Sequence, residues 1–412
     1  MLNPFRPTTL AMALCTLAAL LLTGQADAAG KPLKVYILVG QSNMQGHAMV
    51  RTIEYIGDDP KTKPLHDLMT EDDGSPVTAD RVWISEITGV GDNNGVTSGK
   101  LTTGYGARRT PTQTADKIGP EYAFGLTMQE AYDGPILLIK CAWGGKSLHT
   151  DYRPPSAGKY VFNEGEIENL KKKGKDVQQA ATEKAEATGH YYRLMMGHVK
   201  DVLADPGKVV AGYDKDVGYE IAGFVWFQGF NDRVASGTYP TRDERGGYAN
   251  YSKWMAMFIK DVRKDLEQPE MPFVIGVLGV GGPVDPASAK QTKKHFREAM
   301  ALPAKKMKHV VAINTAVYWD PALAAIDKKR GEVKSMARLL RIKHKNSPNA
   351  NGSMTPAQQK AYLEKYRAEL ISPEEQALWD RGASNQGYHY LGSAKTLSQI
   401  GEAFAKALLE QK

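Results

Sequence analysis

Apolar residues recur along the chain in short runs that predict buried β-strands. Five runs are rich in branched and aromatic side chains, at residues 33–39, 136–142, 221–228, 273–278 and 309–315. Each run is almost continuously apolar, which is typical of strands that are covered on both faces. We therefore expect these five strands to form the buried centre of one sheet.

Helical spacing of apolar residues appears in the segments between these runs, at 121–132, 191–204, 248–266 and 292–301. A last amphipathic segment, 393–409, places its larger apolar side chains on one face. Strands that alternate with helices favour a parallel sheet covered by helices on both sides. The pattern predicts a three-layer α/β/α fold with a central, mostly parallel, five-stranded sheet.

Three stretches interrupt the alternation, at about 50–116, 151–189 and 320–383. The first is rich in Gly, Asp and Thr, the second is polar and Lys-rich, and the third is charged with weak helical periodicity. We interpret them as loop and helix insertions in a single domain that spans 29–412. Ligands of open α/β sheets bind outside the carboxyl ends of the strands, so we expect these insertions to form much of the substrate cleft.

Residues 1–28 have the pattern of a secretory signal peptide. Arg6 supplies a positive start, residues 10–22 form an apolar core, and Ala26-Asp27-Ala28 has the small-x-small form of a cleavage site. The apolar run is shorter than the roughly 20 residues that a membrane anchor needs. The sequence therefore predicts a secreted or periplasmic protein with no membrane insertion after cleavage before Ala29.

Composition narrows the classes of function. The chain has 42% hydrophobic and 24% charged residues among 412, which excludes a fibrous or disordered protein. The net charge of +7 comes from scattered lysines and the cluster Lys171–Lys173, without any motif of nucleic-acid recognition, so we expect no nucleic-acid partner. The 9 histidines show no metal-ligand spacing, and we expect neither a metal nor another cofactor. The sequence does not indicate an oligomeric state.

The candidate chemistry begins where the first predicted strand ends, in Gly40-Gln41-Ser42-Asn43-Met44-Gln45-Gly46. A serine at a strand-to-helix turn is held at the carboxyl edge of the sheet, where nearby glycine allows a close approach of the substrate. Serine is a weak nucleophile at neutral pH and needs a base within hydrogen-bond reach, normally a histidine. These features make Ser42 a candidate nucleophile.

The segment Gly40–Met44 resembles the nucleophile block of SGNH hydrolases, in the variant of sialate O-acetylesterase-like proteins and the sixth carbohydrate esterase family. Further blocks follow in the order of that family, within about residues 34–409: Gly119-Pro120-Glu121, Ala142-Trp143-Gly144-Gly145, Trp226–Asp232 and Gln386-Gly387-Tyr388-His389. The resemblance implies the flavodoxin-like SGNH fold and a carboxylic ester hydrolase with a serine nucleophile.

The resemblance also implies roles for individual residues. Ser42 and His389 would be catalytic. The oxyanion would be bound by the backbone amides of Ser42 and Gly145 and by a side-chain amide, either Asn231 or Gln228. Candidates for substrate binding are Gln41, Trp143 and Tyr388, and Glu121 is expected to brace the loop behind the nucleophile rather than to act as an acid.

Two positions depart from the family pattern. Residue 386 is Gln where the family places the acid that orients the histidine, and residue 230 is Phe where carbohydrate esterases often carry Glu. A neutral amide orients an imidazole but gives little stabilisation to the imidazolium. Three possibilities stay open: His389 acts in a dyad, with or without a backbone carbonyl behind it; another carboxylate such as Asp380 or Asp232 reaches it; or the protein only binds glycan.

The function expected from the sequence is removal of O-acetyl groups from a carbohydrate by two-step acyl transfer. The acetylated substrate would be a hemicellulose such as acetylxylan, or a sialic-acid-like sugar. A glycan-binding protein with weakened catalysis is one alternative, and a lipase-like or thioesterase-like member of the superfamily is another. Fold analogy alone does not choose among these substrates.

Overall fold

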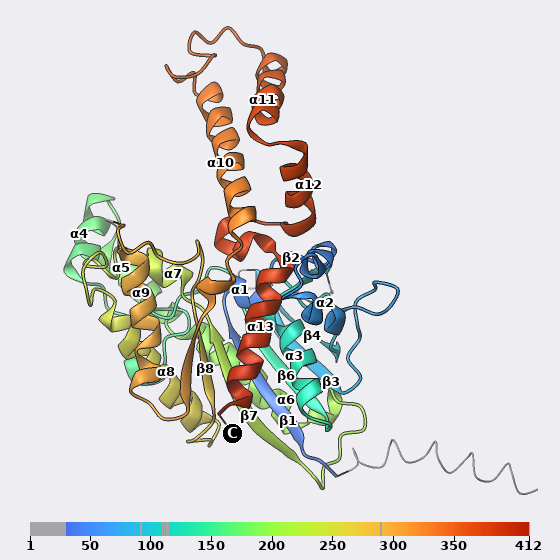
Figure 1. Ribbon diagram of the computed structural model, residues 1–412. Helices are drawn as coiled ribbons and strands as arrows, with labels where there is room; N and C mark the ends of the chain where they lie inside the picture. Colours follow the sequence, from blue (N-terminus) through green and yellow to red (C-terminus); the bar gives the residue numbers. More distant parts are fainter. Residues whose placement is uncertain are drawn as a thin grey trace, which may run out of the picture.

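A seven-stranded sheet forms the centre of the computed structural model, which describes residues 30–411 apart from 91, 92, 109, 111, 113, 114, 289 and 290 (Figure 1). Its strand order is β4-β3-β6-β1-β7-β8-β9. The strands are β1 (Leu33–Gly40), β3 (Val82–Val90), β4 (Asn93–Lys100), β6 (Ile136–Ala142), β7 (Tyr219–Phe227), β8 (Phe273–Val277) and β9 (Val310–Asn314). All neighbouring pairs are parallel except β3 with β4.

The predicted fold class is confirmed, but five strands were too few. The five expected strands correspond to β1, β6, β7, β8 and β9, and β6 and β8 are buried along their whole length. The two additional strands, β3 and β4, lie in the stretch 50–116 that the sequence pattern assigned to an insertion. The antiparallel edge strand β4 reads Asn-Asn-Gly-Val-Thr-Ser-Gly-Lys and has no apolar run, because none of its residues is fully buried.

Helices cover both faces of the sheet. On one face lie α3 (Pro120–Ala131) and α13 (Ala394–Leu409), which pack against each other, and α13 crosses the front of the sheet in Figure 1. The other face carries α6 (His190–Ala204) and α8 (Ala249–Asp265), with α9 (Thr292–Ala301) beside α8. The smaller helices of the body are α1 (Ser42–Gln45), α2 (Lys63–Met69), α4 (Glu164–Lys172), α5 (Val177–Ala187) and α7 (Phe230–Val234). A short ladder pairs β2 (Ala48–Met49) with β5 (Lys117–Ile118).

Three helices form an arm that rises from the edge where the strands end (Figure 1): α10 (Pro321–Arg341), α11 (Pro356–Leu370) and α12 (Pro373–Gly382). Each of them begins with a capping side chain followed by proline, at Asp320, Thr355 and Ser372. The base of the arm has a hydrophobic core of its own, separate from the main core, made by Tyr55, Leu323, Ile326, Ile371, Trp379, Ala383 and Leu391. The arm is therefore packed at its base.

The chain leaves β1 toward β3 and β6 on one side and later returns to β7, β8 and β9 on the other. The strand order thus reverses beside β1, and in open α/β sheets ligands bind at such a point, outside the carboxyl ends of the strands. In the described part of the chain no helix combines the length and the apolar character that crossing a membrane requires. The predicted signal segment, residues 1–28, lies outside the described residues.

Candidate active site

Three strand ends meet at one place on the carboxyl edge of the sheet. Gly40, the last residue of β1, pairs with Ala142 of β6 on one side and with Phe227 of β7 on the other. The motifs that begin after these residues therefore come together, although more than 180 residues separate the first from the last. Parallel register is the reason why distant sequence blocks form one site.

Ser42 lies at the start of α1, directly after β1, and is 8% exposed. Gly40 makes this turn possible, because a Cβ there would lie 2.2 Å from the carbonyl oxygen of Phe227. Gly46 ends the turn with a φ of 90°, in the region that favours glycine. The two glycines thus hold the serine close to β7 and at the edge of the sheet.

A cavity of about 430 Å³ opens over this serine. It is lined by most of the residues that the sequence assigned to the site and by several that it did not: Gln41, Ser42, Gln45, His47, Gly89, Val90, Ala107, Arg108, Gly144, Gly145, Lys146, Phe230, Asn231, Tyr388 and His389. The candidate nucleophile, base and oxyanion-binding groups therefore line one cavity.

Gln41 orients Asn231 through its side-chain amide. Its Nε2 donates to Oδ1 of Asn231 at 3.0 Å, and its Oε1 accepts from the backbone N–H groups of Gly229 and Asn231 at 3.1 and 3.4 Å. Because the Asn231 oxygen is engaged, the amide nitrogen is the group that this side chain can offer to a ligand in the cavity. Gln41 itself is 2% exposed and acts mainly as a brace.

Gln228 does not line the cavity. It is 1% exposed, and its Nε2 donates to the carbonyl oxygen of Lys146 at 3.0 Å and to Asp232 Oδ2 at 2.7 Å. Asp232 also accepts from the backbone N–H groups of Leu148 and His149, at 2.7 and 3.1 Å. The pair therefore ties the glycine loop to the end of β7, and neither side chain is directed at a substrate.

The glycine block forms the wall of the cavity next to Ser42. A Cβ on Gly144 would lie 3.2 Å from Gln45 Oε1 and 3.9 Å from the Ser42 Cβ, so the two loops are in close contact. Gly145 has a φ of 76°, and a Cβ there would meet no atom within 4 Å, so this residue borders open space. Its backbone can approach a bound carbonyl without obstruction.

The two aromatic candidates for sugar binding differ in their placement. Trp143 is 1% exposed, packs against Tyr152 and Tyr191, and donates its indole N–H to Asn94 Oδ1 at 2.7 Å. It is a core residue that does not reach the cavity. Tyr388 is 46% exposed at the rim and packs against Phe230, which occupies the position where related esterases often carry Glu.

His389 is carried by the 3-10 turn η7 (Gly387–Gly392), which is irregular. Tyr390 and Leu391 have φ values of 51° and 62°, a strained conformation for side-chain-bearing residues. The Tyr390 hydroxyl accepts from the backbone N–H of Gly279 at 2.7 Å and lies 2.6 Å from Thr315 Oγ1, so the turn is anchored at the ends of β8 and β9. This anchorage holds the strained turn over the carboxyl edge.

The group beside Nδ1 of His389 is Asn385, whose Oδ1 lies 3.0 Å away. Gln386, the residue at the family's acid position, is exposed and accepts from Lys334 Nζ at 3.1 Å. Asp380 accepts from Gln376 at 2.7 Å, and Asp232 belongs to the brace described above, so neither candidate carboxylate serves the histidine. The side chain of Gln386 is therefore engaged with Lys334, and Asn385, one position earlier, is the side chain beside His389 Nδ1.

A second imidazole, His47, lies face to face with His389. The ring centroids are 3.8 Å apart with an interplanar angle of 5°. Burial lowers the pKa of His389 to about 4, with a further lowering from the charge of Lys117. Burial also lowers the pKa of His47 to about 3, followed by the effect of His389 itself. Both rings are therefore neutral at pH 7, as a general base must be.

Behind the nucleophile lies a network of buried charges that the sequence did not reveal. Lys140, fully buried on β6, donates to Glu121 Oε2 at 2.8 Å and to the carbonyl oxygen of Gln45 at 3.0 Å, and its Nζ lies 3.1 Å from Glu86 Oε1. Arg108 pairs with the other oxygen of Glu86. Glu121 also accepts from the Gly119 N–H at 2.8 Å, which agrees with its expected role as a brace. Next to Lys140, Cys141 is a free, fully buried thiol.

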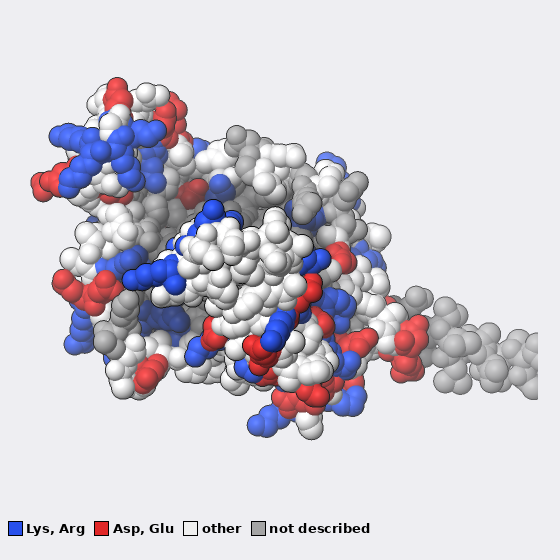
Figure 2. Space-filling view, turned by 90° about the horizontal axis from the view of Figure 1, so that it is seen from above, with Lys and Arg blue, Asp and Glu red and all other residues white. Residues whose placement is uncertain are grey.

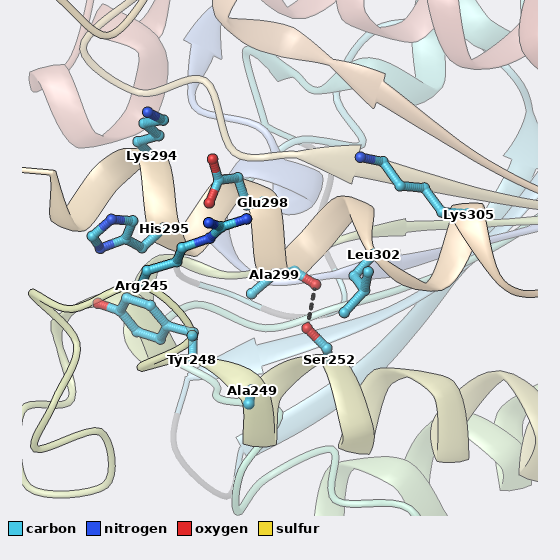
Figure 3. Close-up of a pocket in the computed structure, with 11 residues that line it drawn as sticks. Arg245, Tyr248, Ala249, Ser252, Lys294, His295, Glu298, Ala299, Leu302 and Lys305 are labelled. Atoms are coloured by element: carbon cyan, nitrogen blue, oxygen red, sulfur yellow. Dashed lines mark hydrogen bonds between the residues drawn. The ribbon is translucent and has the colours of Figure 1, made fainter. Parts of the chain in front are cut away.

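A larger groove, of about 680 Å³, lies between α8 and α9 and away from these strand ends (Figure 3). It contains a serine, Ser252, but this hydroxyl donates to the carbonyl oxygen of Ala299 at 2.7 Å. The histidine of the groove, His295, lies on α9. Because the serine is committed to a backbone carbonyl, the groove lacks an activated nucleophile despite its size.

The cluster Lys171–Lys173 is exposed at the carboxyl end of α4. Figure 2 shows basic side chains gathered on a lobe at its upper left, with acidic side chains around them. The described residues contain no group of three or more His, Cys, Asp or Glu side chains that could hold a metal ion. The cavity over Ser42 is thus the place where nucleophile, base and amide donors coincide.

Comparison with known families identifies the chain. The sequence profile described as "Carbohydrate esterase, sialic acid-specific acetylesterase" matches residues 32–320, which is more than half of the sequence. The chain belongs to this family. It is a carboxylic ester hydrolase of the acetylesterase type, and the resemblance inferred from the motifs is confirmed. The match includes Ser42, Gly145 and Asn231 and ends before the arm and His389.

Several solved structures resemble the esterase. A protein from Arabidopsis thaliana is 19% identical, with a TM-score of 0.36, over 69% of this chain and 86% of its own. XAC1771, a carbohydrate acetylesterase from Xanthomonas citri, is 13% identical, with a TM-score of 0.36, over 68% of this chain and 49% of its own. NanS is 14% identical, with a TM-score of 0.35, over 69% of this chain and 78% of its own. A search of curated proteins gave no match.

Proposed function

We propose that the esterase is an exported enzyme that removes O-acetyl groups from a glycan, with Ser42 as nucleophile and His389 as general base. The observation that carries the proposal is the single cavity lined by Ser42, His389, Gly145 and Asn231. Membership of a carbohydrate esterase family supports an acetylated carbohydrate as the substrate. The signal-like pattern of residues 1–28 supports export.

The reaction proceeds by two acyl transfers. Ser42 Oγ attacks the acetyl carbonyl carbon while Nε2 of His389 takes the hydroxyl proton, and the bond to the sugar oxygen breaks as that oxygen receives the proton. Water then attacks the acetyl-serine, gives a proton to His389, and acetate leaves as Ser42 regains its proton. General-base assistance of this kind typically contributes about 10² to 10⁴ in rate.

The oxyanion formed in each step is bound by the backbone amides of Ser42 and Gly145 and by the side-chain nitrogen of Asn231. Gln228 is left out of this set because its nitrogen is committed to Asp232 and to the Lys146 carbonyl. Loss of one such donor typically lowers kcat about 10²- to 10³-fold. Asn231→Ala is therefore expected to lower kcat by that factor with a smaller effect on KM.

The decisive test is hydrolysis of an aryl acetate by the wild type, Ser42→Ala and, as a matched serine control, Ser252→Ala. We expect Ser42→Ala to lose at least about 10³-fold in kcat/KM and Ser252→Ala to keep the wild-type rate. Equal rates for the wild type and Ser42→Ala would reject catalysis by this serine and leave a glycan-binding role. Acetylxylan, O-acetylated sialic acid and a long-chain acyl ester then separate the candidate substrates.

A further inference from the structure

The amide of Asn385 is held in one orientation by its neighbours. The backbone N–H of Gln386, which can only donate, points at Asn385 Oδ1 at 2.8 Å, so the oxygen lies on that side of the amide. The same oxygen is 3.0 Å from Nδ1 of His389 and must accept a hydrogen bond from a ring N–H at that atom. The proton of the neutral imidazole therefore lies on Nδ1, and Nε2 keeps the lone pair that a general base needs.

The nitrogen of the same amide lies 3.5 Å from Nδ1 of His47. An amide nitrogen can only donate, so His47 receives at Nδ1 and carries its own proton on Nε2. Asn385 thus joins two neutral imidazoles of opposite tautomer. His389 donates a hydrogen bond to the oxygen of the Asn385 amide, and the nitrogen of the same amide donates one to His47.

The parallel stacking of His47 on His389 matters when His389 takes the proton of Ser42. A cation is attracted to the face of an aromatic ring, and the attraction is larger where water is excluded. At 3.8 Å the neutral ring of His47 presents such a face to the imidazolium. A protonated His47 would instead repel it, so the arrangement requires that His47 stay neutral during the reaction.

Other charged and titratable groups around the two rings are cationic or neutral. Lys117 on β5 acts on both histidines, and Lys140 on β6 acts on His47. Tyr388 meets His389 edge to face at 4.4 Å, and Arg108 and Lys146 line the same cavity. Among the described residues no carboxylate forms a hydrogen bond or ion pair with either ring.

We propose that Asn385 and His47 are positioning residues that replace the usual carboxylate of a catalytic triad, Asn385 by fixing the tautomer of His389 and His47 by stabilising its imidazolium through the ring face. This inference rests on the proposed function. Burial lowers the pKa of His389, and no carboxylate of the described residues lies beside the ring to raise it again, so the base stays unprotonated in acid. The esterase should therefore work at pH values where a triad with an aspartate has lost its base.

The test measures kcat, KM and the pH profile of aryl acetate hydrolysis. Asn385→Ala should lower kcat by about 10-fold or more with little change in KM. Asn385→Asp should move the acid limb of kcat/KM, expected near pH 4 in the wild type, upward by about one pH unit or more. Gln386→Ala, one residue away and directed at Lys334, is the matched control and should stay within about twofold of the wild type.

The role of the ring face is tested with two variants of His47. His47→Ala removes the face and should lower kcat about 5- to 30-fold, whereas His47→Phe keeps an aromatic face and should retain most of kcat. Equal and wild-type kcat for both variants would overturn the role of His47, and an unmoved acid limb in Asn385→Asp would overturn that of Asn385. Asn385→Asp and His47→Phe nearly preserve the shape of the side chains. If the alanine variants fail to fold, these two variants test the roles of Asn385 and His47.

The two levels of the proposal fail in different ways. If Ser42→Ala retains full activity, the proposed function itself is wrong. If Ser42→Ala is inactive while every variant of Asn385 and His47 behaves as the wild type, only this inference is rejected.

Discussion

At the scale of single residues, the conformation of the turn decides which side chain lies beside His389 Nδ1. The family pattern places the partner three residues before the histidine, at Gln386. In η7 the backbone N–H of His389 donates to the Gln386 carbonyl oxygen at 2.9 Å, and Tyr390 and Leu391 then adopt positive φ values. This turn leaves the side chain of Gln386 outside and places Asn385 at Nδ1.

A substitution that would restore the family acid at its usual position is therefore expected to do nothing. In Gln386→Asp the new carboxylate would lie beside Lys334 at the surface, too remote to stabilise the imidazolium. We predict kcat/KM for an aryl acetate within about twofold of the wild type. A large rise or fall would mean that this position reaches the histidine in the working enzyme.

The two stacked histidines also predict how stability depends on pH. Their pKa values in the folded state, about 4 for His389 and about 3 for His47, lie below the ordinary 6.5. Between about pH 3 and pH 6.5 these two histidines therefore bind more protons in the unfolded chain than in the folded protein. The free energy of unfolding falls as pH is lowered through this range. Above pH 6.5 both histidines are neutral in the folded and in the unfolded state, so they no longer make stability depend on pH.

The variant His47→Phe should flatten this dependence because it removes one titrating group. We expect the Tm of the wild type to fall more between pH 6.5 and pH 4 than that of His47→Phe, measured by calorimetry in buffers of constant ionic strength. Parallel Tm curves for the two proteins would show that His47 is solvated and titrates normally.

Much of the site could be predicted at this scale, and the rest could not for physical reasons. Ser42, Gly145 and Asn231 follow strand ends whose apolar runs are unmistakable. His47 and Asn385 lie in turns, where side-chain direction depends on backbone angles that no periodicity encodes. The signals available were weak: His47 directly follows the nucleophile block, and Asn385 directly precedes the last motif.

At the scale of elements, burial determined which strands could be recognised. The five parallel strands are covered on both faces, and their apolar runs follow from that. Edge strand β4 faces little core, and only Val96 in it is a large apolar residue, 48% exposed. Two helices of the arm begin with sequences typical of a helix start, Thr355-Pro356 and Ser372-Pro373. Because much of the surface of these helices is exposed, the helical spacing of apolar residues in them is weak.

Strand β6 also carries Lys140, whose charge is buried below the candidate active site. Lys140→Met would leave Glu121 buried without its cation and Glu86 with Arg108 alone, and it should lower the free energy of unfolding by about 3–5 kcal/mol. The variant also frees the Gln45 carbonyl, so kcat should fall. Denaturant titration of this variant is compared with Lys171→Met, an exposed lysine that should cost no more than about 0.5 kcal/mol.

The double variant Lys140→Met, Glu121→Gln tests whether the two charges stabilise each other in the folded protein. Removing both charges of a buried pair costs less than removing one, so the double variant should be more stable than the sum of the single changes predicts. Strict additivity would show that the two groups do not interact in the folded protein.

At the scale of the whole molecule, the turn that carries His389 lies between two cores. Ser42 follows the central strand of the main core, and the turn with His389 contributes Tyr390 to that core and Leu391 to the smaller core at the base of the arm. Tyr55 joins that small core to Asp320 through a hydrogen bond of 2.9 Å. The arm therefore helps to position the turn that carries His389, without lining the cavity.

Loss of the small core should consequently reduce activity before the protein unfolds. Trp379→Ala removes its largest side chain and should cost about 3 kcal/mol locally, and kcat should decline on heating at a lower temperature than the loss of far-UV circular dichroism. Ile342→Ala, an exposed residue at the end of α10, is the control and should leave both transitions unchanged. Coincident transitions in Trp379→Ala would mean that the two cores melt as one.

The thiol of Cys141 lies sealed in the middle of the sheet, and burial raises its pKa well above the ordinary value. No cross-link holds the described chain together, and its single sulfhydryl is out of reach of oxidants. Dithiothreitol should therefore leave the enzyme unharmed, and recombinant production in a reducing cytoplasm should yield the same active fold as passage through an oxidising compartment.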